Sequence, residues 1–217
     1  MSSANQIYSV DMTDAERPQI KLAQTLPSDD NRFGESDVAI HDSRWLIMGS
    51  DTLGELILWD ISVQPGRLIK TIRFDTKSPI KGLSWSADGR LLVVPVGDWA
   101  VRVWDIDWTR ADDPIFTLRD QQVLGTLAVM SPQESVMATW VDGHAEIELW
   151  DVSQTPFERL SQIEGGRKFA FSPDGKHLAI AVHLGIELYA HENAEWVRRY
   201  LLSEGMAAVT SLAWSPD

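Results

Sequence analysis

Three Trp-Asp pairs recur at nearly equal intervals, and this repeat limits the fold of the chain more than any other feature. The three tryptophans, Trp59, Trp104 and Trp150, are 45 and 46 residues apart. Each pair ends a stretch in which side chains of two kinds alternate, as in Glu146-Ile-Glu-Leu-Trp150. Alternation with a period of two is typical of a half-buried β-strand. A strand that returns at this interval predicts a repeat architecture built from β-sheets.

A second series of motifs lies between the Trp-Asp pairs and has a similar period. Trp85-Ser-Ala-Asp-Gly89 and Phe171-Ser-Pro-Asp-Gly175 are near copies of each other. Partial copies begin at Met130 and Trp214, and His41-Asp-Ser-Arg44 holds the same place in the first unit. Pro, Asp and Gly supply a fixed φ, a side-chain cap and a residue that accepts positive φ. The motif therefore predicts a tight turn between two antiparallel strands.

Each unit contains four predicted strands, with the tight turn between the first two and the Trp-Asp pair at the end of the third. The predicted second strands are residues 45–49, 91–96, 136–141 and 177–183. The predicted fourth strands are residues 67–74, 114–118, 157–163 and 196–202. Four antiparallel strands in about 40–45 residues form one blade of a β-propeller.

On these motifs the chain resembles the WD40-repeat β-propeller family over residues 37–217. The resemblance implies an all-β fold, a WD40-type propeller of four-stranded antiparallel blades. The expected blades are residues 37–75, 79–119, 123–163 and 167–202, followed by a partial blade at 208–217. The residues that match the family's signature are Trp59, Asp60, Asp98, Trp104, Asp105, Trp150 and Asp151.

The chain departs from the family pattern in two ways. No Gly-His pair precedes a predicted first strand, although the family uses that His in a buried hydrogen-bond set with Ser or Thr, Trp and Asp. Asp98 fits the Asp of that set, but without the His we expect the blades to depend more on packing. In the fourth unit Tyr189 stands where Trp is expected, and Tyr also combines a large flat body with a polar tip.

The two ends of the sequence predict an incomplete ring. Residues 1–36 contain two predicted strands of a closing blade, residues 6–11 and 19–26, and residues 210–217 resemble a first strand with half a turn. A closed ring would remove the exposed sheet edges that promote aggregation. We therefore expect a fragment of a longer protein, and the alternative is a small five-bladed ring with an irregular closing blade.

Composition excludes several classes of function. The net charge of −13 and pI of about 4.7 disfavour nucleic acid as a partner, because an acidic surface repels phosphates. No apolar stretch approaches the roughly 20 residues of a membrane span, so we expect no membrane partner. The chain has no cysteine, which excludes disulfides and thiolate zinc sites. We expect a cytoplasmic location, or a nuclear one in a eukaryote.

Motifs of catalysis are absent from the sequence. It has no Gly-rich phosphate loop, no Gly-x-Ser-x-Gly elbow and no His-Glu-x-x-His helix. His177, His183, His191 and Glu192 could form a metal cluster, but we favour a turn residue, a strand end and a loop. We therefore expect no enzyme activity, no catalytic residue, no cofactor and no metal site.

Loops between second and third strands, and links between blades, are free to vary towards a partner. The candidate partner-binding residues there are Trp99, Lys77, Lys81, Arg119, Arg167 and Lys168. An aromatic side chain at a loop tip is a common interface anchor, although Trp99 could instead pack on a neighbouring loop. The cations could receive an acidic peptide or a phosphate-bearing partner, or could simply be solvated surface charges.

The expected function is that of a scaffold or adaptor that binds a protein or peptide partner without chemistry of its own. Rigid blades hold such loops in fixed positions, so little ordering entropy is lost on binding. One alternative is a regulatory or sensor module of a larger signalling protein. Another, from a different class, is a propeller enzyme such as a hydrolase.

Overall fold

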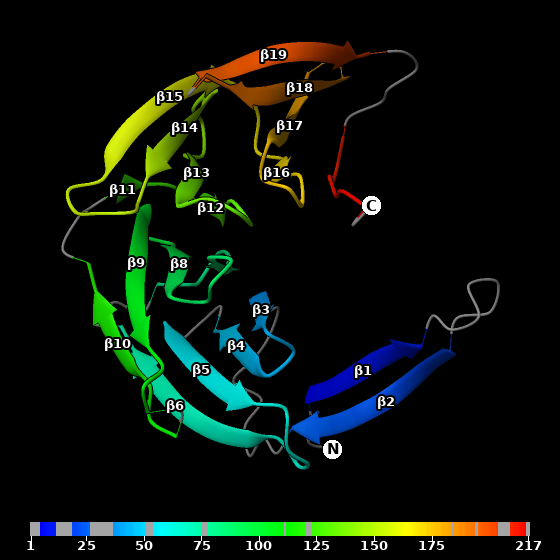
Figure 1. The fold of residues 1–217 in the computed structure, drawn as a ribbon, viewed down its shortest axis with the longest axis vertical. Coiled ribbons are helices and arrows are strands. Elements are labelled where there is room, and N and C mark those ends of the chain that lie inside the picture. The colour runs from blue at the N-terminus through cyan, green and yellow to red at the C-terminus, as the bar shows by residue number, and fades with distance from the viewer. Residues whose placement is uncertain are drawn as a thin grey trace. The chain divides into compact units, whose positions relative to one another are not determined.

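The computed structural model is all-β (Figure 1). It describes residues 5–11, 19–26, 37–50, 54–74, 78–110, 112–119, 123–183, 185–193, 195–203 and 209–215. Within these ranges no helix is long and apolar enough to cross a membrane. The chain divides into two compact units, residues 1–80 and 81–217, which are described separately.

The first unit holds a two-stranded hairpin and one four-stranded antiparallel sheet. The hairpin pairs β1 (Asn5–Asp11) with β2 (Gln19–Leu26), so both strands predicted near the N-terminus are present. The sheet, called blade 1, has the order β3 (Asp37–His41), β4 (Trp45–Gly49), β5 (Glu55–Asp60) and β6 (Arg67–Arg73). Its core joins Leu26 of the hairpin to Leu46, Met48, Ile57 and Trp59.

The second unit holds three antiparallel sheets. Blade 2 contains β7 (Ser84–Trp85), β8 (Leu91–Val96), β9 (Ala100–Asp107), β10 (Ile115–Leu118) and β11 (Val123–Leu124). Blade 3 has the order β12 (Leu127–Met130), β13 (Val136–Trp140), β14 (Glu146–Asp151) and β15 (Glu158–Glu164). Blade 4 has the order β16 (Phe169–Phe171), β17 (His177–Val182), β18 (Gly185–Glu192) and β19 (Glu195–Leu202).

Second strands are largely buried because both of their faces pack against apolar side chains. Every residue of β4, β8 and β13 is buried. One apolar cluster joins blade 2 to blade 3 through residues such as Val93 and Met137, and another joins blade 3 to blade 4 through Leu149 and Ile180. Stacking of this kind explains why a repeat of four strands can form a common core.

The predicted tight turns form as the motif requires. In blade 4 the Ser172 hydroxyl donates to Asp174 at 2.5 Å and accepts from the His177 backbone N–H at 2.9 Å. Gly175 closes the turn with a φ of 69°, a region that suits glycine. Ser86, Asp88 and Gly89 of blade 2 repeat this arrangement, so one short motif sets the same turn in two blades.

The third strands share a further irregularity at the Trp-Asp position. The register between third and fourth strands shifts at Trp59 in blade 1, at Trp150 in blade 3 and at Tyr189 in blade 4. A bulge at the same place in three blades confirms that Tyr189 takes the place of the repeated tryptophan.

Two ranges differ from the sequence prediction. Val123 and Leu124, expected to open the third unit, instead pair with Val101 and Ala100 of β9 and extend the outer edge of blade 2. The predicted first strand near the C-terminus is wrong, since residues 209–215 carry no strand pairing. A side-chain contact holds this segment instead: Trp214 donates its indole N–H to the Ala170 carbonyl at 2.9 Å.

The buried hydrogen-bond set is only partly formed, as the missing His implies. Trp150 donates its indole N–H to the Thr139 hydroxyl at 3.1 Å. The buried indole N–H of Trp59 meets no acceptor in the described part of the chain. Asp98 does not join such a set: its carboxylate lies in a partly exposed ion pair with Arg102 at 2.9 Å. The prediction for Asp98 is therefore corrected, because the nearby guanidinium draws the carboxylate away from the core.

Candidate functional site

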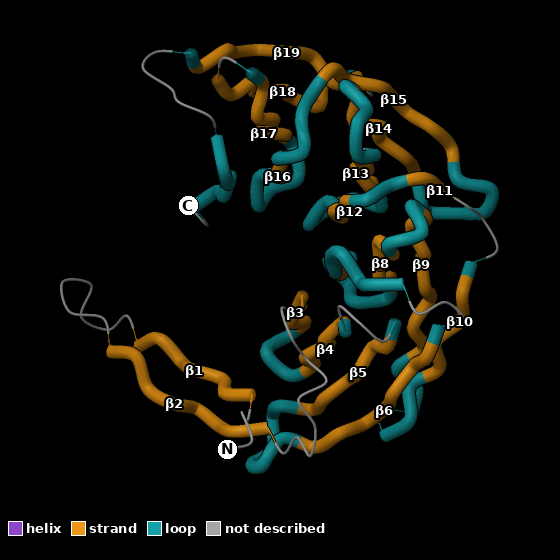
Figure 2. Tube along the Cα trace, turned by 180° about the vertical axis from the view of Figure 1, so that it is seen from behind, coloured by secondary structure: helices purple, strands orange, loops and turns teal. Residues whose placement is uncertain are grey.

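Each blade of the second unit has two different ends. Tight turns join first to second and third to fourth strands at one end, which we call the turn end. Loops between second and third strands, and links between successive blades, lie at the opposite end, which we call the loop end (Figure 2). The partner-binding residues were predicted for the loop ends.

A groove of about 750 Å³ opens at the loop ends of blades 3 and 4. It is lined by the link between the two blades, by the ends of their second and third strands, and by one residue near the C-terminus. The lining residues are Ala145, Glu164, Gly165, Gly166, Arg167, Lys168, Ala181, Val182, His183, Glu187 and Val209. The structure thus brings together two of the six predicted binding residues, Arg167 and Lys168.

The link that carries these two cations is held tightly against both blades. Gly165 donates its backbone N–H to Ala145 of blade 3 at 2.8 Å, and Gly166 donates to Ala181 of blade 4 at 3.2 Å. A Cβ on Gly166 would lie 2.7 Å from the Ala181 carbonyl oxygen, and one on Gly165 would lie 2.5 Å from Ile180. Only glycine fits this close approach, so the Gly-Gly pair fixes where Arg167 and Lys168 emerge.

Arg167 and Lys168 are both exposed at the rim of the groove. The Arg167 guanidinium lies 6.0 Å from the ring centre of Trp140, within the range of a cation–π contact. Trp140 is buried and donates its indole N–H to the His144 carbonyl at 2.9 Å. A fixed ring from blade 3 therefore orients a cation carried by the link to blade 4.

Glu187 is the buried charge of the groove. Arg198 forms an ion pair with its carboxylate, and the Tyr189 hydroxyl donates to it at 2.8 Å. Burial, and then the hydrogen bond to Glu187, raise the pKa of Tyr189 to about 12, so this hydroxyl stays a donor at neutral pH. The negative charge of Glu187 is therefore already stabilised from within blade 4.

Trp99 lies at the loop end of blade 2, as predicted, in the hairpin between β8 and β9. Its side chain is 56% exposed, and its φ of 67° belongs to the left-handed region. Glycine is favoured at this position of a three-residue hairpin, because other side chains are strained there. Leu124, 58% exposed, pairs with the next residue, Ala100, so the two apolar side chains project from neighbouring backbone.

The remaining predicted cations divide into three cases. Lys81 is exposed, and its backbone N–H donates to Pro95 at the loop end of blade 2. Lys77 lies outside the described residues. Arg119 follows β10, and its side chain turns towards the turn end, where it lines a second pocket.

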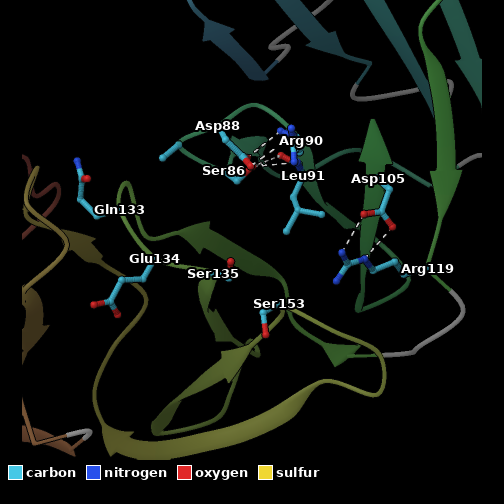
Figure 3. A pocket seen from close by; sticks show the side chains of 11 residues that line it. Ser86, Asp88, Arg90, Leu91, Asp105, Arg119, Gln133, Glu134, Ser135 and Ser153 are labelled. Carbon is cyan, nitrogen blue, oxygen red and sulfur yellow. Dashed lines mark hydrogen bonds and ion pairs between the residues drawn. The ribbon is translucent and has the colours of Figure 1, made fainter. Parts of the chain in front are cut away.

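This second pocket, of about 390 Å³, lies at the turn ends of blades 2 and 3 (Figure 3). Arg119 makes a bidentate contact with Asp105, with both distances 2.8 Å. It also donates to the Val152 carbonyl of blade 3, and its guanidinium lies 5.7 Å from the Phe157 ring centre. Because the donors of Arg119 are used between the blades, this side chain joins blade 2 to blade 3.

The signature aspartates are structural in the described parts of the chain. Asp60 is buried and accepts from Arg44 at 3.0 Å and from the Ser62 hydroxyl at 2.6 Å. Asp151 accepts from the Ser153 backbone N–H at 2.8 Å. Burial raises the pKa of Asp60, but the hydrogen bonds from Ser62 and Arg44 outweigh it and hold the pKa below its usual value.

The histidines considered as metal ligands are separated by their contacts. His177 lies near Asp174 and Trp214, and His191 stacks on Trp196 with ring centres 4.9 Å apart. His183 lines the groove. Among the described residues no group of three or more His, Asp or Glu side chains is arranged to hold a metal ion.

Sequence reasoning missed Gly165, Gly166 and Glu187. A Gly-Gly pair at the junction of two repeat units is a detectable signal, because glycine at a blade link indicates a close approach of backbones. Nothing in the local sequence marks Glu187 as buried, since its burial depends on Tyr189 and Arg198 from the same sheet.

Comparisons with known proteins agree with this architecture. Residues 66–105 match the family described as WD domain, G-beta repeat. The chain is 25% identical over 165 residues to the WD repeat-containing protein 55 homolog of Drosophila persimilis, a match that covers 76% of this chain. The chain therefore carries a WD40 repeat and is similar to WD repeat proteins. This WD40-repeat chain spans 30% of the length of that relative.

Solved structures show the same fold at low sequence identity. Sqt1 of Chaetomium thermophilum, bound to the N-terminus of the ribosomal protein L10, matches with a TM-score of 0.60 and 17% identity, over 90% of this chain and 55% of that one. A Bacteroides uniformis protein whose proposed activity is that of a 6-phosphogluconolactonase matches with a TM-score of 0.68 and 15% identity, over 94% and 66%. These likenesses establish the propeller fold of the WD40-repeat chain.

Proposed function

We propose that this WD40-repeat chain is a non-catalytic scaffold that binds a protein or peptide partner in the groove at the loop ends of blades 3 and 4. The observation that carries the proposal is the place of Arg167 and Lys168, at the rim of a groove whose floor is backbone and small side chains. A groove of this volume that combines small apolar side chains with a set of charged groups has the usual form of a ligand site.

The chemistry of the chain favours a polypeptide as the partner. A net charge of −13 opposes binding to nucleic acid or to an anionic membrane surface. The related fold of Sqt1 is described with the N-terminus of a ribosomal protein bound, which supports a peptide as the occupant of a propeller. A cytoplasmic location completes the proposal, since the chain has no cysteine and no disulfide to protect.

A propeller hydrolase is the second candidate, and the fold of the Bacteroides uniformis protein is the reason to consider it. The turn-end pocket has three carboxylates, from Asp88, Asp105 and Glu134. Asp105 is engaged by Arg119. Burial raises the pKa of Asp88, but hydrogen bonds from Arg90 and Ser86 outweigh it and lower that pKa. A general acid needs the opposite shift, so we favour binding over catalysis.

Selection from a random peptide display library tests the proposed function. Peptides selected on the wild-type chain are synthesised, and their Kd values are measured by fluorescence anisotropy. Ala145→Trp fills the groove from an exposed position, and we expect it to weaken binding at least tenfold. Ser135→Trp, at an exposed position in the turn-end pocket, is the matched control and should bind as the wild type does.

Two results would contradict the proposed function. One is that no peptide is enriched on the folded wild-type chain. The other is that Ser135→Trp abolishes binding while Ala145→Trp retains it, which would assign the partner to the turn ends.

A further inference from the structure

Some charged side chains of the groove are paired within the chain, and others can still interact with a ligand. Glu187 is stabilised internally by Arg198 and Tyr189. Its field is therefore largely cancelled within blade 4. The charges that face a ligand are those of Arg167 and Lys168, opposed by Glu164. Their sum is positive, in a chain whose net charge is −13.

Most of the described arginines lie beside a carboxylate, whereas Arg110 and Arg167 do not. Nine arginines lie within ion-pair distance of a carboxylate: Arg44, Arg67, Arg73, Arg90, Arg102, Arg119, Arg159, Arg198 and Arg199. Within the described residues Arg167 has no such pair, and neither does the adjacent Lys168. An acidic chain offers many carboxylates, so an Arg-Lys pair without one, oriented by Trp140, indicates that the carboxylate comes from a ligand.

The floor of the groove fits an extended chain. Gly165 and Gly166 leave their backbone uncovered, and the neighbouring Ala145 and Ala181 have only methyl side chains. A ligand backbone can approach such a surface closely, whereas a deep enclosed cavity would suit a compact small molecule. An extended peptide could place one side chain against Arg167 and Lys168 while its backbone runs along the floor.

We propose that the groove takes the carboxylate side chain of an extended acidic peptide between Arg167 and Lys168. The proposal rests on the proposed function and names its ligand class. A carboxylate carries one negative charge, whereas a phosphate group carries about 1.5 to 2 at neutral pH. Arg167, Lys168 and Glu164 together carry a net charge of about +1. One carboxylate neutralises this charge, whereas a phosphate group would leave excess negative charge on a chain whose net charge is already −13, so the balance of charge favours aspartate or glutamate.

Three fluorescein-labelled nonapeptides test the proposal by anisotropy. The first is Ser-Ala-Glu-Ala-Glu-Ala-Glu-Ala-Ser, and the others carry glutamine or phosphoserine in place of every glutamate. We expect the glutamate peptide to bind most tightly. The double variant Arg167→Gln, Lys168→Gln should weaken that binding about tenfold, because it removes charge-assisted hydrogen bonds. Binding should also weaken as salt rises.

The matched control removes the same two charge types at the turn ends of the same unit. Arg90→Gln, Lys176→Gln changes two exposed cations outside the groove, and we expect a change in Kd below about twofold, since only the long-range field is altered. Both double variants change exposed side chains, and a shared unfolding midpoint checks that the two chains are equally folded.

Three outcomes would overturn the proposal. They are equal affinity for the glutamate and glutamine peptides, tighter binding of the phosphoserine peptide, and equal losses in the two double variants. The two proposals can fail separately. If library peptides bind in the groove but show no enrichment of acidic residues, the proposed function stands and the acidic ligand does not.

Discussion

The turn ends and the loop ends of blades 2–4 use the same kinds of polar residue in different ways. At the turn ends Ser172 and Asp174 satisfy each other within a turn, and Gln133 of blade 3 donates to Pro173 of blade 4 at 3.2 Å. At the loop ends Arg167 faces solvent beside the groove, and Trp99 is exposed in a strained conformation.

This difference separates structure from recognition. Polar groups at the turn ends are bound to the chain itself, so they fix the blades and leave little for a partner. Side chains at the loop ends are positioned by the rigid blades, and they contribute little to the stability of those blades. We therefore expect substitutions at the turn ends to change stability, and substitutions at the loop ends to change binding.

The largest expected effect is the loss of the side chain that joins blade 2 to blade 3. Arg119→Met removes the bidentate contact with Asp105 and the donation to Val152. The free energy of unfolding should fall by about 2–3 kcal/mol, because the side chain is largely buried and its bonds are charge-assisted. Urea denaturation measures the change. Arg90→Met, in an exposed pair, should cost under about 0.5 kcal/mol, and equal losses would remove the distinction.

A pH dependence should come from Asp60, the last residue of β5 in blade 1. Its pKa is lowered in the folded chain, so the carboxylate stabilises the fold fully above its unfolded pKa of about 3.9. That contribution is lost as the pH falls through the lower folded value. Denaturation from pH 6 to pH 2 should therefore show a loss of stability below about pH 4 that is smaller in Asp60→Asn. Identical pH profiles for the two proteins would refute this role.

A smaller effect is expected for the repeated turn motif. Ser172→Ala leaves the His177 backbone N–H without its side-chain acceptor, which should cost about 1 kcal/mol. Ser135→Ala, at an exposed site in the neighbouring blade, should change the unfolding midpoint by much less. A Ser172→Ala chain as stable as the wild type would show that the turn depends on Gly175 alone.

The smallest change, with the opposite sign, is expected at the loop end of blade 2. Trp99→Gly relieves the strain of a positive φ, which costs roughly 1 kcal/mol for an ordinary residue. The greater freedom of glycine in the unfolded chain offsets part of the gain. We expect equal or slightly higher stability in thermal denaturation. A loss above about 1 kcal/mol would mean that Trp99 packs within the fold and is not held out for a partner.

Local patterns allowed the blades to be predicted from sequence. Strand alternation, the Trp-Asp series and the Ser-x-Asp-Gly turn depend on neighbours in the chain, and the second and fourth strands of blade 1 lie within a residue of their predicted places. Contacts between blades could not be predicted, because Arg119 reaches Val152 only after two sheets have packed. The place of Asp98 was also missed, for a local reason: Arg102, four residues further along the chain, holds the carboxylate in a partly exposed ion pair.

The candidate site was predictable in part. Arg167 and Lys168 follow from their position in a link between repeats, and that position also explains their exposure. The groove beside them depends on how Gly165 and Gly166 fit against two different sheets, which no single stretch of sequence specifies.

The most direct test of the separation between the two ends is a hydrogen-exchange footprint of the wild-type chain with a selected library peptide bound. We predict slower exchange in residues 164–168 and 181–183, which line the groove, and unchanged exchange in residues 86–91 and 131–135 at the turn ends. Protection confined to the turn-end segments, with none in the groove, would contradict the account.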